Sequence, residues 1–510
     1  MDVLFIVPGN AAGIYQELAN TYSSIEPPAW ALLLAGSCRS IGFTVGLIDI
    51  NAERLSTQAV IERINEFSPR LLCFVVYGQN VNAGTTNMSE AVNLANSIKT
   101  ANISTPIAFL GSYMQALPIK TLEDERCVDI VFTNEGVYAL RNLLKEPVID
   151  LTKLDHIKGI GFRKNGAAFL TPPERLVPQD KLDIDLPEYA WDLLPHIAKP
   201  MDLYRSPLWH ANYDYNKRTP YGTLYTSLGC KFGCDFCMVN ILNRTDNAPI
   251  GIASNYRVVR CWTKDFVIRE IDKLVAMGVY TIRIMDEMFL LNPNHYIPIC
   301  EELAKKDYSD KLLLWSYSRV DTIAGNPTIL QLLRKAGFRW LALGIESGDR
   351  NIRVDISKGK FGNSDIKNTI TSIHNVGIEV MGNYIFGLPN DNAESMQKTL
   401  DLSIELCTSG WNAYAVMPLP GSKLYKNALN QGYKLPKEYS GYSFHSYTTT
   451  PMPTNHLSAA EVLQFRDNAY TTYHTNDAFL DRIKTIFGNN AANNILEMTK
   501  VKLKRKLLGD

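Results

Sequence analysis

Cys230-Lys231-Phe232-Gly233-Cys234-Asp235-Phe236-Cys237 places three cysteines within eight residues, in a loop directly after a strand predicted at residues 223–227. Three thiolates this close can bind one soft metal centre. Zinc sites usually pair one C-x-x-C with a second pair elsewhere, and this sequence has no second pair. The set suits an iron–sulfur cluster with one iron left free of protein ligands, where a substrate or cofactor can chelate.

Around this loop the chain alternates strands and helices. Helical patterns at residues 266–277, 327–336 and 364–376 each stop at a glycine, which is the expected helix end. Six βα units fall short of the eight of a closed barrel, so an open, partial barrel is predicted over residues 219–430. Its strands are expected at residues 223–227, 280–285, 312–318, 340–345, 378–386 and 413–417.

Strands and helices also alternate in the first 145 residues. Their apolar strands predict a parallel sheet that is covered on both faces, a doubly wound, Rossmann-like α/β domain. Ligands of such sheets bind beyond the carboxyl ends of the strands. Strands are expected at residues 2–7, 44–48, 71–76, 107–110 and 130–132, with helices at 30–40, 57–67 and 89–99. A dinucleotide fingerprint is missing after the first strand, because residues 8–13 match G-x-G-x-x-G poorly.

Two regions do not follow this alternation of strands and helices. Residues 146–218 read as a connector that wraps around its neighbours, with a hairpin on the turn Asn165-Gly166. Residues 431–510 read as a C-terminal region that is helical from Ser458 onward.

Composition excludes several classes of protein. The chain has 510 residues, 46% of them apolar, which rules out disorder as the main state. Lys+Arg and Asp+Glu are both 52, so the basic excess of a nucleic-acid-binding protein is absent. There is no apolar run long enough for a spanning helix and no signal-peptide pattern, so the cytoplasm is the expected location. The six scattered cysteines are expected to be buried small apolar residues.

The C-x-x-x-C-x-x-C spacing, with an aromatic residue before the last cysteine, resembles the radical S-adenosylmethionine (SAM) superfamily. Five further fragments resemble the ends of that family's later barrel strands, in the right order: residues 284–289, 318–321, 343–348 with 358–359, 384–389 and 418–422. The resemblance implies a [4Fe-4S] cluster on Cys230, Cys234 and Cys237, with SAM on the open iron. An electron from the cluster would then cleave SAM to a 5′-deoxyadenosyl radical.

The same resemblance implies where SAM binds. The backbone at Phe236 would meet the adenine, and polar groups at strand ends would hold the ribose and methionine parts; the candidates are Ser318, Arg319, Glu346 and Ser347. Glu346 could instead be a structural acid paired with Arg319. Asp286 and Glu287 are left open between a ligand contact and a structural role, since the family's usual Gly-Gly-Glu-Pro-like segment is absent.

A doubly wound domain before such a barrel is similar to the cobalamin-binding subgroup of the family. The resemblance implies that cobalamin contacts Tyr77, Gln79, Gly111, Ser112, Glu135 and Gly136, which follow the third, fourth and fifth strands. Small residues at Gly111-Ser112 would let a nucleotide tail approach the backbone. No histidine precedes His156, so no side chain of this domain would supply an imidazole to cobalt. The alternative is an ordinary nucleotide-binding domain.

The resemblance implies a cobalamin-dependent radical SAM methyltransferase that transfers a methyl group from methylcobalamin to a carbon of a small or medium organic substrate. The alternative keeps both cofactors for a cyclisation or ring rearrangement without methyl transfer. A methylthiotransferase and a non-catalytic cobalamin sensor fit the motifs less well. The expected partners are the substrate and an external flavodoxin- or ferredoxin-like one-electron reductant, with no nucleic acid. An aromatic segment would close the barrel mouth: Tyr439, Tyr442, Phe444, His445 and Tyr447.

Overall fold

The computed structural model describes residues 1–9, 11–78, 81–359 and 361–510. The N-terminal part is a seven-stranded sheet in the order β2-β1-β3-β4-β5-β6-β7. Its first five strands are parallel, which confirms the doubly wound prediction. They are β1 (Val3–Val7), β2 (Val45–Asp49), β3 (Leu71–Val76), β4 (Ile107–Gly111) and β5 (Ile130–Phe132).

Helices connect these strands and bury them. The apolar strands leave almost no side chain in contact with solvent, as a sheet covered on both faces requires. The chain passes from β1 to β2 on one side and then to β3 on the other, so the crevice for a ligand lies outside the carboxyl ends of β1 and β3. The helices are α3 (Ala29–Arg39), α5 (Thr57–Phe67), α6 (Met88–Thr100), α8 (Pro118–Asp124) and α9 (Val137–Lys145).

The predicted hairpin is confirmed. β6 (Ile160–Lys164) pairs antiparallel with β7 (Ala167–Leu170) and adds both strands to the edge of the N-terminal sheet. Asn165 and Gly166 have φ values of 51° and 83°, as a type I′ turn demands. The start of the connector is therefore part of the first sheet.

The second half of the chain forms the predicted open barrel. Its six strands are parallel, in the order β15-β14-β13-β12-β11-β8. The strands are β8 (Tyr221–Leu224), β11 (Thr281–Ile284), β12 (Leu313–Arg319), β13 (Phe338–Glu346), β14 (Glu379–Phe386) and β15 (Gly410–Ala415). The outer helices are α11 (Lys264–Ala276), α12 (Pro293–Leu303), α14 (Ile329–Lys335), α16 (Asn363–Asn375) and α17 (Ala393–Leu406).

The first barrel strand ends earlier than predicted, because the chain leaves the sheet at Leu224. Ser227 and Leu228 instead form β9, which pairs antiparallel with β10 (Arg260–Cys261). The Asp286 carboxylate stabilises this exit by accepting the Thr226 N–H at 2.6 Å and the hydroxyls of Thr226 and Ser227, each at 2.6 Å. These contacts give Asp286 a structural role.

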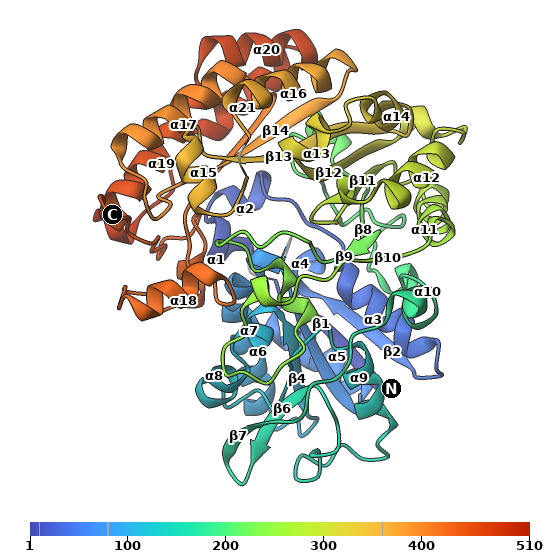
Figure 1. Cartoon of the computed structure of the whole chain (residues 1–510). Helices are drawn as coiled ribbons and strands as arrows, with labels where there is room; N and C mark the ends of the chain where they lie inside the picture. Colours follow the sequence, from blue (N-terminus) through green and yellow to red (C-terminus); the bar gives the residue numbers. More distant parts are fainter. Residues whose placement is uncertain (10, 79–80, 360) are drawn as a thin grey trace.

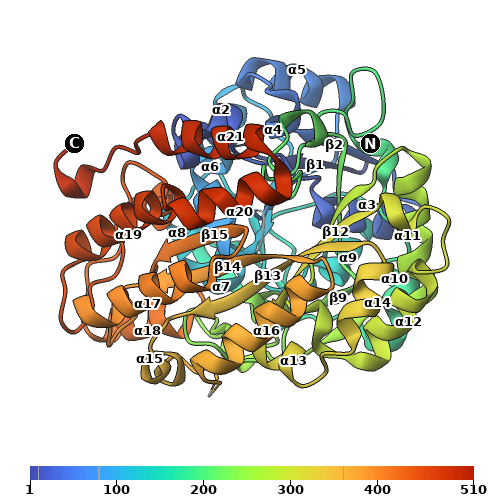
Figure 2. The ribbon, with the colours of Figure 1, turned by 90° about the horizontal axis from the view of Figure 1, so that it is seen from above.

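Figure 1 shows the N-terminal sheet beneath the half-barrel, with the C-terminal helices in red at the far side of the barrel. These helices are α19 (Ala459–His474), α20 (Asp477–Phe487) and α21 (Asn489–Lys500), which confirm the helical C-terminal prediction. Seen from above, α20 and α21 lie side by side, and α19 packs against β15 (Figure 2). Among the described residues, no helix is long and apolar enough to cross a membrane.

Candidate functional site

One cavity of about 550 Å³ lies where the two halves of the chain meet. The segments after β1 and β3 border it from the N-terminal domain, so it opens at the expected crevice. The cysteine loop and the inner side chains of the barrel strands border it from the other half. The C-terminal segment supplies Tyr442, Phe444 and His445. A single space therefore contacts the cysteine loop, the barrel interior, the segments after β1 and β3 and part of the C-terminal aromatic segment.

The cysteine loop presents all three thiols to this cavity. Asn240 holds its start: the Asn240 amide donates to the Cys230 carbonyl at 2.8 Å, and the Cys230 N–H donates back to it at 2.7 Å. Three cysteine thiols from one loop that border the same cavity are a donor set that fits a three-thiolate iron–sulfur cluster.

Burial raises the pKa of the Cys230 thiol to about 11 and holds the pKa of the Cys237 thiol well above its usual range. Both thiols are thus protonated at neutral pH without metal. Metal binding displaces these protons, because the coordinating ligand is the thiolate.

Four of the five candidate SAM contacts border the cavity: Phe236, Ser318, Arg319 and Glu346. The Arg319 guanidinium lies 3.9 Å from the centroid of the Phe232 ring in the cysteine loop and pairs with Asp321 at 2.8 Å. Its Nη1 lies 3.9 Å from the Cys234 sulfur. A fixed positive charge therefore stands beside one cluster thiol.

Glu346 is paired with Lys358 at 2.6 Å, so the suggested Arg319–Glu346 pair is wrong. Glu346 has a φ of +66°, and the strand register shifts between Gly344 and Glu346. A left-handed conformation at a non-glycine residue costs about 1–3 kcal/mol and is typical of functional sites. Here it accompanies a carboxylate that borders the cavity.

Ser347 does not border the cavity. It is buried, with its hydroxyl 3.2 Å from that of Thr399 and accepting the Asp349 N–H at 3.1 Å. A SAM contact at Ser347 stays a prediction.

The structure gives different environments to Asp286 and Glu287, the two acids whose roles the sequence left undecided. Asp286 supports the chain as described above, whereas Glu287 borders the cavity. Burial raises the Glu287 pKa to about 7, although Arg283 opposes the shift. Within the described residues its carboxyl group has no hydrogen-bond partner. Because this pKa lies near neutrality, a positively charged ligand group would favour the carboxylate form, so Glu287 fits such a group near the cluster cysteines.

The candidate cobalamin contacts lie at the carboxyl edge of the N-terminal sheet, and those described do not border the cavity. Tyr77 accepts a hydrogen bond from the Gln115 amide at 2.7 Å, and Gln79 lies outside the described residues. A Cβ on Gly111 would lie 2.2 Å from the Val76 carbonyl, so the chain approaches closely there. The Gly111, Ser112 and Gly136 contacts stay predictions.

Glu135 joins several parts of the chain. Its carboxylate accepts the Val177 N–H at 2.6 Å and pairs with Arg260 of β10 at 2.7 Å. These bonds link the N-terminal domain to the connector and to the β9–β10 pair beside the cysteine loop. A cobalamin contact at Glu135 stays a prediction.

The sequence analysis missed the 3₁₀ segment Val81–Asn87, from which Asn82, Ala83 and Thr86 border the cavity. The Asn82 side chain also accepts the Met238 N–H next to the cysteine loop, at 3.0 Å. The rule that ligands bind beyond the strand ends would have found this segment if it had been followed past Gln79.

The same edge contains three buried oxygens that have no hydrogen-bond partner within the described residues. They belong to the side chains of Thr85, Ser112 and Gln115. Buried polar atoms are rarely left unpaired in native proteins. These oxygens therefore fit a polar ligand, such as the nucleotide tail of cobalamin, at the end of β4.

Comparison with known proteins agrees with this geometry. The B12 binding domain family matches residues 16–144, and the Radical SAM superfamily matches residues 224–403. The chain belongs to the cobalamin-binding radical SAM enzymes. An uncharacterized methyltransferase of Pyrococcus horikoshii is 24% identical over 96% of this chain and 95% of its own length.

Two further similar proteins have names that state different activities, a cyclase and a methyltransferase. An anaerobic magnesium-protoporphyrin IX monomethyl ester cyclase of Cereibacter sphaeroides is 23% identical over 94% of this chain and 71% of its own. The solved radical SAM methyltransferase TsrM of Kitasatospora setae, with tryptophan and a SAM analogue bound, superposes with a TM-score of 0.67 at 16% identity, covering 100% of this chain and 97% of that one. The solved structure supports the fold.

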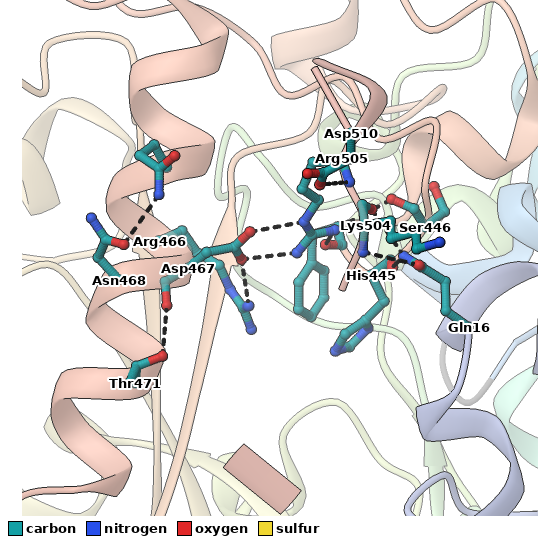
Figure 3. A network of polar contacts seen from close by, with 12 residues as sticks. Gln16, His445, Ser446, Arg466, Asp467, Asn468, Thr471, Lys504, Arg505 and Asp510 are labelled. Carbon is teal, nitrogen blue, oxygen red and sulfur yellow. Dashed lines mark hydrogen bonds and ion pairs between the residues drawn. The ribbon is translucent and has the colours of Figure 1, made fainter. Parts of the chain in front are cut away.

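In this radical SAM enzyme, the C-terminal tail holds the aromatic wall of the cavity in place (Figure 3). Arg505 is buried and donates to the carbonyls of Phe444 at 2.8 Å and Ser446 at 3.3 Å, while it pairs with Asp467 of α19 at 2.8 Å. Gln16 of the N-terminal domain donates to the His445 carbonyl at 2.7 Å and accepts the Lys504 N–H at 3.1 Å. The tail therefore joins three distant segments.

Only part of the expected aromatic segment borders the cavity; its other described residues form hydrogen bonds elsewhere. The His445 ring packs at a tilt against the rings of Phe444 and Tyr15, with centroids 4.0 and 5.0 Å apart. Burial holds the His445 pKa well below its usual range, so the imidazole facing the cavity is neutral. Tyr439 instead donates to Glu125 of the N-terminal domain at 2.6 Å, and Tyr447 donates to the Asp510 carbonyl at 2.9 Å.

Replacing Arg505 with methionine should loosen this wall. The variant loses bonds to one carboxylate and two carbonyls, and we expect a local destabilisation of about 2–4 kcal/mol. Backbone amides of residues 443–447 should then exchange with deuterium at least ten times faster. Lys502→Met, on the same tail, is the matched control and should leave exchange unchanged. Equal exchange in both variants would show that the tail does not hold the wall.

Proposed function

We propose that the protein is a cobalamin-dependent radical SAM methyltransferase that methylates a carbon of a small or medium-sized organic molecule, in the cytoplasm and with an external one-electron reductant. The observation that supports this proposal is the single cavity shared by the cysteine loop, the segments after β1 and β3, and the barrel interior. A radical step needs both cofactors and the substrate within one enclosed space, because proximity determines whether the radical meets its partner before it is quenched.

When bound, the cluster supplies the electron that cleaves SAM, and cobalamin supplies the methyl group. The residues of this chain would bind and orient these groups. Cys230, Cys234 and Cys237 would hold the cluster. Arg319 and the Glu346–Lys358 pair would fix the polar parts of SAM.

The remaining roles concern SAM and the barrel mouth. Glu287 would pair with a positively charged group of SAM or substrate, because Glu287 borders the cavity. Phe236 would meet the adenine. Phe444 and His445 would cover the substrate and exclude water.

The reaction products test this proposal. Methyl transfer by this route consumes two SAM molecules, so S-adenosylhomocysteine and 5′-deoxyadenosine should form in a ratio of about one to one per methylated product. The experiment incubates the reduced, reconstituted enzyme with cell extract and methyl-labelled SAM. It then identifies the metabolite that gains the label and counts both nucleosides.

A second candidate function is a cyclisation or rearrangement without methyl transfer, favoured by the anaerobic cyclase named among the relatives. Such a reaction has no use for the methyl group. A product that appears with 5′-deoxyadenosine, but without label and without S-adenosylhomocysteine, would replace methyl transfer with this alternative.

A further inference from the structure

We propose that a groove on the outer side of the cysteine loop, defined by Lys231, Arg257 and Lys264, docks an acidic one-electron carrier protein. The groove has a volume of about 900 Å³ and is separate from the cavity described above. The inference rests on the proposed function, because that function needs an electron from outside the chain.

The cysteine loop is the wall between the cavity and this groove. Cys230, Phe232 and Cys234 border the cavity, whereas Lys231, within the same loop, borders the groove. Arg257 packs against the loop, since a Cβ on Gly233 would lie 3.5 Å from the Arg257 side chain. A carrier seated in the groove is therefore separated from the cluster thiols by one loop of backbone.

The charge of the groove selects the partner. Among the described residues, its lining contains three Lys and Arg side chains and no carboxylate, although the whole chain has zero formal net charge. Lys231, Arg257 and Lys264 are exposed. Within the described residues, neither Lys231 nor Arg257 is recorded in an ion pair, and Lys264 approaches only Asp265, at 3.6 Å. This concentration of positive charge attracts an acidic surface and speeds association.

The partner is a protein with an exposed apolar contact as well as acidic charge. Val258, adjacent to Arg257, is 44% exposed and adds apolar surface beside the cations. Small, weak interfaces of this kind are typical of redox encounters. One electron passes from the reduced flavin or iron–sulfur centre of the carrier, which is oxidised, to the cluster, which is reduced.

Charge reversal tests the groove. The variant Arg257→Glu/Lys264→Glu is compared with Lys153→Glu/Lys500→Glu, which makes the same change in net charge at exposed lysines on other segments. Reduced flavodoxin is the probe carrier. We expect it to reduce the cluster of the groove variant at least about tenfold more slowly at low salt, and that of the control at the wild-type rate. Electrochemical reduction through a neutral mediator should be unchanged in both.

Binding provides a readout that does not depend on turnover. Calorimetry should show weaker flavodoxin binding to the groove variant than to the control, with the difference shrinking as salt rises. Equal flavodoxin rates and affinities in the two variants would overturn the docking site. Slower mediator-driven reduction in the groove variant would also overturn it, by assigning the defect to the cluster itself. Neither measurement depends on methyl transfer, so the groove and the proposed function fail separately.

Discussion

Replacing Cys230, Cys234 and Cys237 together with alanine will abolish iron binding and 5′-deoxyadenosine formation. The wild-type chain should hold about four iron and four sulfide after anaerobic reconstitution, because three thiolates suit one [4Fe-4S] cluster with an open iron. All three thiols border the same cavity, so no other described cysteine is placed to replace them there. Iron and sulfide analysis, together with chromatography of SAM cleavage products, measures the effect.

The matched control is the triple change of Cys38, Cys73 and Cys127 to alanine. All three are buried in the N-terminal domain, as expected for apolar core residues. The control should keep its full iron content and its SAM cleavage. Iron retained at wild-type level in the first variant, or lost in the control, would show that the cluster is held elsewhere.

Replacing Arg283 with methionine will destabilise the contact between the two halves of the chain by about 3–5 kcal/mol. Arg283, on β11, pairs with Glu26 of the N-terminal domain at 2.7 Å, and the two side chains are 2% and 7% exposed. The Arg283 guanidinium also lies 4.7 Å from the centroid of the Trp315 ring. Without the arginine, the Glu26 carboxylate is left buried without its opposite charge. Urea titration of the wild type and the variant measures the loss.

The destabilisation should depend on pH. Burial raises the Glu26 pKa, and Arg283 opposes that shift, so the folded-state pKa of Glu26 rises further in the variant. The folded chain then holds a proton that the unfolded chain releases above its ordinary value of about 4.3, and stability falls as pH rises through this window. The double variant Glu26→Gln/Arg283→Met removes the buried charge and should recover part of the stability at pH 8. Equal stability of single and double variants at every pH would contradict this account.

Local sequence patterns determined the two α/β units. Buried apolar strands, glycine helix stops and the Asn165-Gly166 turn act over a few neighbouring residues, and the structure confirms each of them. The cysteine spacing is equally local, because eight consecutive residues carry the three thiols. Family membership followed from these signals together.

The sequence could not show how the cavity is assembled, and only the tertiary structure decided this. Glu346 pairs with Lys358, and the Asp286 carboxylate accepts the Thr226 N–H whereas the neighbouring Glu287 borders the cavity. These environments depend on packing, which the spacing of residues along the sequence does not encode. Glu26 meets Arg283 across 257 positions of sequence, and Gln16 meets Lys504 across 488. Such contacts form only when the whole chain has folded, because burial, rather than local propensity, selects the partner of a buried charge.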